Sequence, residues 1–321
     1  MPGAGIDSLC AQSRQLGSST LYVGALGIGT AALSTPYGAP GAERSAPAAA
    51  AAVRTLEHAL RCGISFIDTA PAYGDAESVV GAACRGADCR IATKLAIPDQ
   101  GWETLSAAAI SDHVRRSVHR SLIALGRARI DLLQVHNADS DLVARGDVPG
   151  ALEALRQENL VLACGATVYG EENALAAISC PVFDAVQIAY NALDRRPERR
   201  VLAAASEHAT GLIVRSVLLR GVLSSAGREL GGEFAALRAG ADRFRVAIGA
   251  SWEELPGAAV AFALTRPGIS CTLLGPRDTD ELDLLLCGAE QFLDAARELQ
   301  GDWDAEMTPQ LLDPSRWAEL G

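Results

Sequence analysis

Lys94 is the only lysine in the chain, and arginine accounts for the rest of its 28 basic residues. A lysine ammonium is a compact charge that can give up its proton when buried, whereas an arginine stays protonated, so the two are not interchangeable in a site. Lys94 comes directly after Arg90–Thr93, a short apolar run typical of a buried strand. We therefore interpret Lys94 as a functional residue, with a chance surface lysine as the alternative.

Three more residues with side chains that can take part in catalysis lie at or shortly after the ends of apolar runs. Asp68 comes after Ile64–Ile67, His136 after Ile130–Val135, and Tyr73 lies in the segment that follows Asp68. Each has an ordinary explanation by itself, because an aspartate there often caps a helix and a histidine often lies satisfied in a core. Their shared position at successive strand ends predicts one site.

The four side chains fit proton transfer at a carbonyl group. A phenol is a weak acid at neutral pH, with an ordinary pKa of about 10, and a nearby ammonium stabilises the phenolate. Asp68 would pair with Lys94, so that no charge is buried alone. His136 would donate a hydrogen bond to the carbonyl oxygen or help to pass a proton to or from Tyr73. The hydride must come from a cofactor, because no side chain supplies one.

Apolar runs recur at eight places, separated by patterns of helical period. They are continuous rather than alternating, as in parallel strands covered on both faces. This alternation predicts a (β/α)8 TIM barrel that forms a single domain over residues 1–321, with its active site at the carboxyl ends of the strands; a doubly wound sheet is the alternative. The expected strands are Tyr22–Leu26, Ile64–Ile67, Arg90–Thr93, Ile130–Val135, Leu160–Cys164, Ala185–Ile188, Gly211–Val214 and Cys271–Leu274.

Two segments fall outside the repeating pattern. A long loop, Gly221–Ala250, follows the seventh strand, with a short helical piece at Phe234–Leu237, and a C-terminal extension follows the last helix. In a barrel such a loop usually covers the ligand end; the alternative is a mobile surface loop. The helices expected between strands are residues 48–60, 111–125, 150–158, 197–208, 253–265 and 279–286.

Composition narrows the class of protein. The net charge of −11 argues against a nucleic-acid or membrane-surface partner. Residues Met1–Gly17 lack a basic region followed by an apolar run, so we expect no signal peptide, and no apolar stretch is long enough to span a bilayer. None of the eight cysteines forms a C-x-x-C pair. We expect reduced thiols in a cytoplasmic protein and no metal site.

The segment Phe66–Gly74, with Lys94 and His136, resembles the aldo-keto reductase family. The catalytic Asp, Tyr, Lys and His of that family match Asp68, Tyr73, Lys94 and His136, which we call the tetrad. The resemblance covers nearly the whole chain. It implies a barrel that binds NAD(P)(H) in an extended form across its mouth, without a Rossmann fold, and no G-x-G-x-x-G motif follows an early strand here.

The resemblance also implies the reaction. It is the interconversion of a carbonyl (an aldehyde, ketone or sugar) and its alcohol by hydride transfer, with Tyr73 as general acid/base. One alternative is an NAD(P)-dependent sugar (aldose) 1-dehydrogenase. Another, from a different class, is a cofactor-sensing binding subunit with little turnover. The partner would be a small carbonyl or sugar, and a monomer and a homo-oligomer both remain open.

Residues at the later strand ends would hold the cofactor by the same resemblance. Gln187 would bond the nicotinamide amide, and Ser216 and Leu218 would contact the pyrophosphate. Arg215 stands where many members stack a tyrosine on the nicotinamide, and Val168 where many have an asparagine. The full implied set is Gly29, Thr30, Thr167, Gln187, Arg215, Ser216, Leu218, Gly221, Gly275, Arg277 and Glu281.

The adenosine end carries opposing signals about the nucleotide. Arg277 favours NADP, because a guanidinium can meet a 2′-phosphate with two hydrogen bonds. Asp278, Asp280 and Glu281 favour NAD, whose ribose diol accepts a carboxylate partner. We expect NADP(H), with NAD(H) as the alternative. For the substrate pocket the candidates are Tyr37, Trp102 and Tyr169, followed by Trp303 and Trp317; ordinary packing is the alternative for each.

Overall fold

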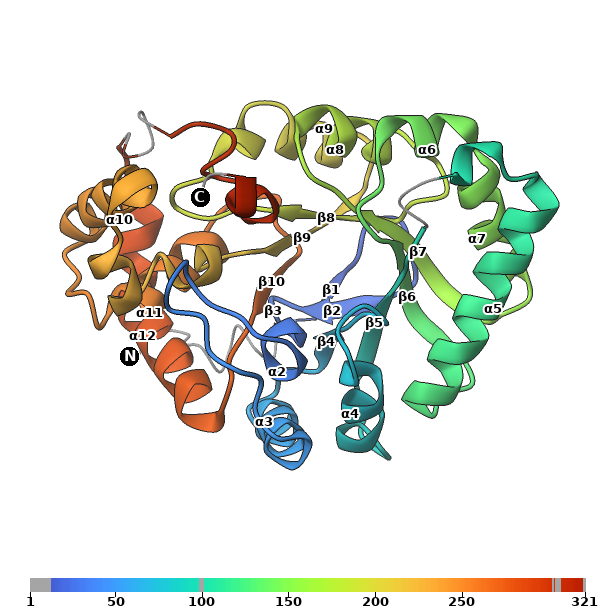
Figure 1. Cartoon of the computed structure of the whole chain (residues 1–321), viewed down its shortest axis with the longest axis horizontal. Coiled ribbons are helices and arrows are strands. Elements are labelled where there is room, and N and C mark those ends of the chain that lie inside the picture. Colours follow the sequence, from blue (N-terminus) through green and yellow to red (C-terminus); the bar gives the residue numbers. More distant parts are fainter. Residues whose placement is uncertain (1–12, 98–100, 302, 304–306, 320–321) are drawn as a thin grey trace.

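Eight parallel strands close into a barrel in the order β10-β3-β4-β5-β6-β7-β8-β9, with helices around the outside (Figure 1). The computed structural model describes residues 13–97, 101–301, 303 and 307–319. This architecture confirms the predicted (β/α)8 barrel. The barrel strands are β3 (Leu26–Gly29), β4 (Phe66–Asp68), β5 (Arg90–Leu95), β6 (Ile130–Val135), β7 (Val161–Thr167), β8 (Ala185–Ala189), β9 (Gly211–Arg215) and β10 (Cys271–Leu274).

The helices form the outer layer, because each connection between parallel strands must cross over the sheet. Within the described residues no helix is long and apolar enough to cross a membrane. The helices are α2 (Ala31–Ser34), α3 (Ala49–Arg61), α4 (Ala76–Ala83), α5 (Ala107–Leu125), α6 (Ser140–Arg145), α7 (Asp147–Gln157), α8 (Glu171–Ile178), α9 (Val201–Glu207), α10 (Ala235–Ile248), α11 (Leu255–Leu264) and α12 (Thr279–Glu298). Short 3-10 turns are η1 (Trp102–Thr104), η2 (Arg196–Glu198), η3 (Leu219–Gly221), η4 (Ser225–Glu229), η5 (Gly232–Phe234) and η6 (Pro314–Glu319).

The first strand lies later in the chain than predicted. The run Tyr22–Leu26 was expected to be the first barrel strand, but Tyr22–Gly24 is β2, which pairs antiparallel with β1 (Ser13–Gln15) outside the barrel. The barrel begins with β3, which contains two glycines. Glycine is depleted in strands because it offers no side chain to pack, so local pattern favoured the apolar run before it.

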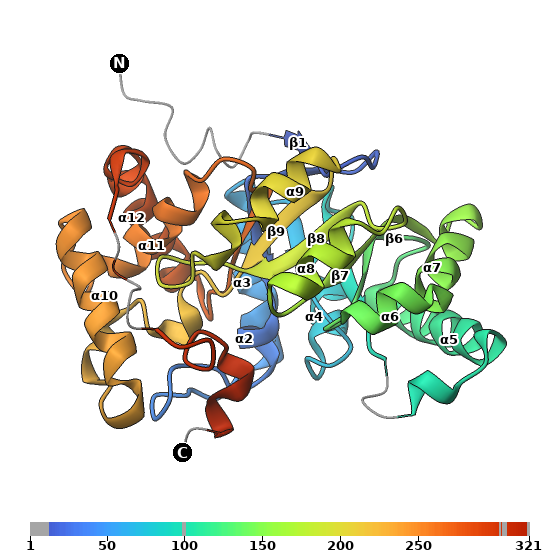
Figure 2. The ribbon, with the colours of Figure 1, turned by 90° about the horizontal axis from the view of Figure 1, so that it is seen from above.

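The hairpin of β1 and β2 closes one end of the barrel. Leu16, Leu21 and Val23 are buried and belong to the same apolar cluster as inward-facing strand residues such as Phe66 and Leu132. Figure 2 shows β1 at one end of the molecule and the C-terminal segment at the other. The strand ends that carry the tetrad are therefore at the end away from the hairpin.

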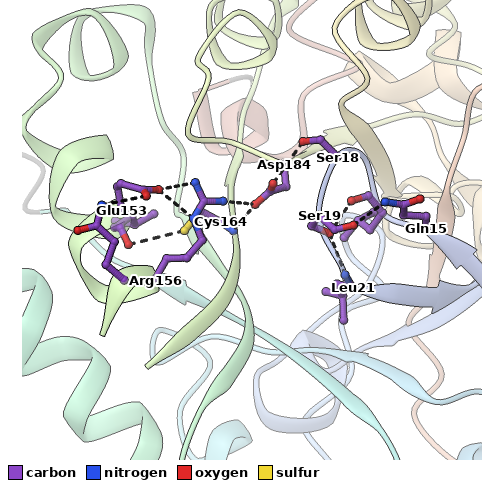
Figure 3. A network of polar contacts seen from close by, with 11 residues as sticks. Gln15, Ser18, Ser19, Leu21, Glu153, Arg156, Cys164 and Asp184 are labelled. Carbon is purple, nitrogen blue, oxygen red and sulfur yellow. Dashed lines mark hydrogen bonds and ion pairs between the residues drawn. The ribbon is translucent and has the colours of Figure 1, made fainter. Parts of the chain in front are cut away.

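Asp184 fastens the hairpin to the barrel (Figure 3). Its carboxylate accepts hydrogen bonds from the Cys164 backbone N–H (2.9 Å), the Arg156 guanidinium (2.9 Å) and the Ser18 hydroxyl (3.4 Å). The adjacent Gly17 has a φ of +59°, and a Cβ there would lie 2.0 Å from the Asp184 carbonyl oxygen. The turn therefore requires glycine, and the network belongs to the closed end of the barrel.

The segment after the seventh barrel strand is more helical than predicted. Only Phe234–Leu237 was expected to be helical within Gly221–Ala250, whereas α10 extends for 14 residues. Its buried face is formed by Leu237, Ala241 and Phe244, a helical spacing. Charged residues and a glycine between these positions hid the pattern. The last helix, α12, likewise continues well beyond the predicted 279–286.

Candidate active site

The tetrad assembles at the rim formed by three neighbouring strands. Asp68 ends β4, Lys94 lies near the end of β5, and His136 follows β6 directly. These strands are paired in parallel, with Asp68 opposite Ala92, so their carboxyl ends share one edge. Tyr73 lies in the turn between β4 and α4. The sequence-predicted set of four is therefore brought together.

Lys94 and Asp68 form a buried ion pair. The Lys94 Nζ lies 2.5 Å from Asp68 Oδ2 and donates a second hydrogen bond, of 2.9 Å, to the Thr69 carbonyl oxygen. Both side chains are almost fully buried, with 1% and 5% of their surface exposed. Removing one member of such a pair would leave an uncompensated buried charge. The ammonium is therefore held in one place.

Two glutamines complete the surroundings of Asp68. The Nε2 atoms of Gln134 and Gln187 each donate a hydrogen bond of 2.9 Å to Asp68 Oδ1. Gln134 was not predicted, although a glutamine within an apolar strand and two residues before His136 was a usable signal, because a buried amide needs partners. Gln187 is buried and its amide donates to Asp68; its predicted bond to the nicotinamide stays a prediction.

Tyr73 and His136 face each other beside the ammonium. The Lys94 Nζ lies 5.0 Å from the centroid of the Tyr73 ring. The Tyr73 and His136 rings are 6.0 Å apart between centroids and almost perpendicular, at 85°. A phenol, an imidazole and an ammonium thus converge at the mouth of the barrel, where a small carbonyl group could meet all of them.

His136 is held in its neutral form. Burial, reinforced by the positive charges of Lys94 and Arg215, lowers the pKa of His136 to about 4, while Asp68 opposes this shift. At neutral pH the ring therefore carries one N–H, which suits donation of a hydrogen bond to a carbonyl oxygen. Of the two predicted roles, this favours the hydrogen-bond donor over the proton relay.

Two tyrosines and two arginines line the rim next to the tetrad. The Arg215 guanidinium lies 4.2 Å from the Tyr169 ring centroid, and the Arg220 guanidinium 4.9 Å from that of Tyr37. Burial raises the pKa of Tyr37, and the charges of Arg220 and Arg215 oppose the rise, while Tyr169 and Tyr73 add to it. Tyr37 and Tyr169, both predicted for the pocket, are therefore grouped around the mouth.

The three tryptophans that were predicted as pocket candidates are each packed against neighbouring side chains. Trp102 is buried in η1, where the Arg145 guanidinium lies over its ring, and it borders a small cavity with Ile110 and Val148. Trp303 packs on Phe244 and Phe262, and Trp317 on Phe234. Their place in a substrate pocket stays a prediction, with ordinary packing as the alternative.

Two of the predicted cofactor-binding threonines lie next to the tetrad and already have hydrogen-bond partners. The N–H and hydroxyl of Thr30, which follows Gly29 in β3, both bond the Asp68 carbonyl oxygen, at 3.0 and 3.1 Å. The Thr167 hydroxyl accepts a hydrogen bond of 2.9 Å from the Asn137 N–H. These residues shape the inner wall.

The loop after β9 is conformationally strained. Ser216, Leu219 and Arg220 have φ values of 60°, 45° and 53°, which non-glycine residues seldom adopt, and Gly221 has a φ of 93°. Asn191 holds the loop by donating a hydrogen bond of 3.0 Å to the Ser216 carbonyl oxygen. Such strain is concentrated in ligand clamps. The residues predicted to contact the pyrophosphate, Ser216 and Leu218, therefore lie in a strained loop, as residues that hold a ligand often do.

The predicted adenosine end is held by Arg277 and Glu281. Glu281 accepts hydrogen bonds from the Arg277 backbone N–H (2.9 Å) and the Arg44 guanidinium (2.7 Å). The Arg277 guanidinium donates to carbonyl oxygens of Tyr37, Arg44 and Ser45. Its buried Nε has no partner among the described residues. A Cβ added at Gly275, two residues before Arg277, would meet nothing within 4 Å. An orphaned donor next to a second arginine fits an anionic ligand.

The chain is similar to a known family of proteins. The aldo/keto reductase family profile matches residues 25–287. The chain belongs to the aldo-keto reductase family. Members are oxidoreductases that generally use nicotinamide cofactors and act on small carbonyl compounds.

Two curated relatives are plant proteins. The chain is 27% identical to "Probable aldo-keto reductase 1" of Glycine max over 221 residues, which is 67% of this chain and 62% of that protein. It is 32% identical to L-galactose dehydrogenase of Arabidopsis thaliana over 164 residues, 48% of this chain and 47% of that protein. The matches thus span less than two thirds of the length of these relatives.

Solved structures share the barrel. A protein of Pseudomonas aeruginosa, provisionally named an aldo-keto reductase, is 29% identical, with a TM-score of 0.66 over 89% of this chain and 96% of that one. The aldo-keto reductase AKR11C1 of Bacillus halodurans, in its holo form, is 23% identical, with a TM-score of 0.70 over 92% and 99% of the two chains. The latter likeness shows the fold alone.

Proposed function

We propose that this aldo-keto reductase is an NAD(P)(H)-dependent oxidoreductase that interconverts a small carbonyl compound and its alcohol. The observation that carries the proposal is the Lys94 ammonium, fixed by Asp68 and lying 5.0 Å from the centroid of the Tyr73 ring. A phenol beside a buried ammonium is suited to exchange a proton with an alkoxide. We assign Tyr73 as the general acid/base, Lys94 as the charge that supports it, and Asp68 as the partner of Lys94.

The remaining residues orient the reacting group. A bound nicotinamide cofactor would supply or accept the hydride. Neutral His136 would donate a hydrogen bond to the carbonyl oxygen and so place it next to the Tyr73 hydroxyl. As reduction proceeds, Tyr73 gives its proton to that oxygen, and the Lys94 ammonium stabilises the phenolate left behind. In the oxidative direction Tyr73 takes the proton back.

The residues around Arg277 support NADP(H). Burial, followed by the charge of Arg44, lowers the pKa of Arg277, while Glu281 and Asp278 oppose the shift. The buried Nε of Arg277 has no partner among the described residues. A 2′-phosphate would accept a hydrogen bond from this donor and meet the charges of the two arginines. We accordingly place NADP(H) ahead of NAD(H).

A sugar 1-dehydrogenase is the second candidate. Its support is the 32% identity to a plant L-galactose dehydrogenase over about half of each chain. Oxidation of a sugar lactol needs the same proton transfer by Tyr73 in the reverse direction. The choice between these candidates is therefore a matter of the substrate and not of the tetrad.

The test is Tyr73→Phe, which removes only the hydroxyl. We expect turnover of every aldehyde, ketone and sugar accepted by the wild type to fall by at least about 100-fold, a typical contribution of general acid/base catalysis. Binding of NADPH and NADH, titrated by fluorescence, should stay unchanged. Tyr22→Phe, an exposed tyrosine at the closed end, is the matched control.

Two outcomes would count against the proposal. Full turnover by Tyr73→Phe would refute the assigned acid/base. Tight nucleotide binding by the wild type, without turnover of any tested carbonyl, alcohol or sugar, would favour the alternative of a cofactor-sensing subunit.

A further inference from the structure

A cluster of metal-ligating side chains lies where the barrel closes. α3 follows β3, the first barrel strand, and α12 follows β10, the last, so the two helices are neighbours at the seam (Figure 1). His58 and Cys62 are one turn apart at the end of α3, and Asp283 is on α12. The cluster therefore joins residues 225 positions apart in the sequence.

The ligand atoms are spaced as a metal would require. His58 Nε2 lies 2.7 Å from Asp283 Oδ1 and 3.9 Å from Cys62 Sγ, and the three ligand atoms all lie within 4.8 Å of one another. Tetrahedral zinc with ligands at about 2.0–2.3 Å places neighbouring ligand atoms about 3.3–3.7 Å apart. Small side-chain rotations would bring the present distances into that range.

The donor set selects the kind of metal. An imidazole nitrogen, a thiolate and a carboxylate are the three ligand types that zinc combines, whereas magnesium and calcium prefer oxygen alone. The side chains of His58 and Asp283 are 23% and 54% exposed, so an ion can reach them from solvent. None of the three belongs to the tetrad or to the predicted cofactor residues.

We propose that His58 Nε2, Cys62 Sγ and the Asp283 carboxylate bind one zinc ion, which clamps α3 to α12. Binding replaces the His58–Asp283 hydrogen bond with two metal–ligand bonds and adds a third from the sulfur. The neutral His58 ring moves its proton from Nε2 to Nδ1, so that Nε2 is free to bind the metal, and the Cys62 thiol loses its proton to solvent when the zinc–sulfur bond forms. No electron is transferred.

The fourth ligand would be a water molecule or a further side chain of α12. Both helices follow barrel strands that run in parallel, so they point in the same direction. Cys287 is exposed and lies one turn beyond Asp283 on α12, just as Cys62 lies one turn beyond His58 on α3. Water or Cys287 would complete the tetrahedron.

The proposal is tested with the full chain, purified without a histidine tag and reduced with a phosphine. Cobalt(II) is titrated first, because thiolate ligation gives a charge-transfer band in the near ultraviolet, and zinc then displaces it. We expect one equivalent bound with that band, and a melting temperature that zinc raises. Calorimetry in buffers of different ionisation enthalpy should detect the released proton.

Variants locate the site. Loss of even an outer-shell partner typically weakens metal binding by about 10- to 100-fold, so Cys62→Ser, His58→Gln and Asp283→Asn should each weaken zinc binding at least tenfold. Cys62→Ser should also lose the charge-transfer band. Asp294→Asn, an exposed carboxylate also on α12, and Cys180→Ser, a buried thiol elsewhere, should bind as the wild type does.

Three results would overturn the proposed zinc site. Wild-type zinc affinity in both Cys62→Ser and His58→Gln, or bound cobalt without the thiolate band, would overturn the site. So would a larger loss in Cys287→Ser than in Cys62→Ser. Because binding is measured without turnover, the result does not depend on the function proposed for the tetrad.

Discussion

Lys94 sits in a place that only a slender ammonium can occupy. It bonds Asp68 and the Thr69 carbonyl oxygen at once, and Asp68 in turn accepts from Gln134 and Gln187. Asp68, the partner of the Lys94 ammonium, is therefore itself held in place by two glutamines. This explains why a chain with a single lysine among 28 basic residues keeps it here.

Lys94→Arg should not preserve function. The guanidinium is bulkier and spreads its charge over a plane, so it should crowd Tyr73 and hold the phenolate less well. We expect turnover to fall by at least about 100-fold and stability to fall by about 1–3 kcal/mol from overpacking, as measured by steady-state kinetics and urea denaturation. Arg115→Lys, in a surface pair with Glu158, should change neither; wild-type turnover in Lys94→Arg would contradict the role assigned to the ammonium.

His136 should make the fold sensitive to acid. Its pKa is about 4 in the folded protein, against 6.5 for an unperturbed histidine, so the unfolded chain binds a proton first as pH falls. The free energy of unfolding is therefore not reduced by His136 above about pH 6.5. Between pH 6.5 and pH 4 it falls progressively, by on the order of 1–3 kcal/mol. Urea denaturation across this range should show a shallower loss for His136→Gln; parallel curves for the two proteins would contradict the shift.

Among the elements, β3 shows how neighbours can override local preference. A Cβ on Gly27 would lie 2.8 Å from the Phe66 ring and 2.9 Å from the Leu273 side chain. Glycine is a poor strand former, yet packing across the barrel leaves room for nothing larger. The strand is thus defined by its partners, β4 and β10, and not by its own residues.

A matched pair of substitutions in β3 separates packing from propensity. Gly27→Ala should destabilise the protein by about 1–3 kcal/mol, because buried side chains must shift. For Gly29→Ala the nearest neighbour is the Leu274 carbonyl oxygen at 3.7 Å, an ordinary contact, so we expect less than about 0.5 kcal/mol. Denaturant midpoints measure both, and equal losses would refute the packing argument.

Across the whole molecule, the two ends of the barrel have different tasks. The closed end buries an apolar cluster under the β1–β2 hairpin and fixes it through Asp184. The open end collects the tetrad, two rim tyrosines and a strained loop. The seam between α3 and α12 adds the proposed zinc site, whose residues belong neither to the tetrad nor to the hairpin. Stability and chemistry can therefore be changed separately.

The barrel and the grouping of the tetrad can both be predicted from the amino-acid sequence. Seven of the eight strands are recognisable because a strand buried on both faces is a continuous apolar run, and the four reactive residues follow such runs directly. The carboxyl ends of parallel strands share one rim, so order along the chain was enough to bring them together.

The contacts between distant segments are visible in the folded structure and not in the sequence. Folding joined Gln134 and Gln187 to Asp68 and turned the Arg277 guanidinium towards residues 37–45. It also joined His58 and Cys62 to Asp283. Such contacts depend on helix packing and barrel closure between segments far apart in the chain, and no local pattern encodes that information.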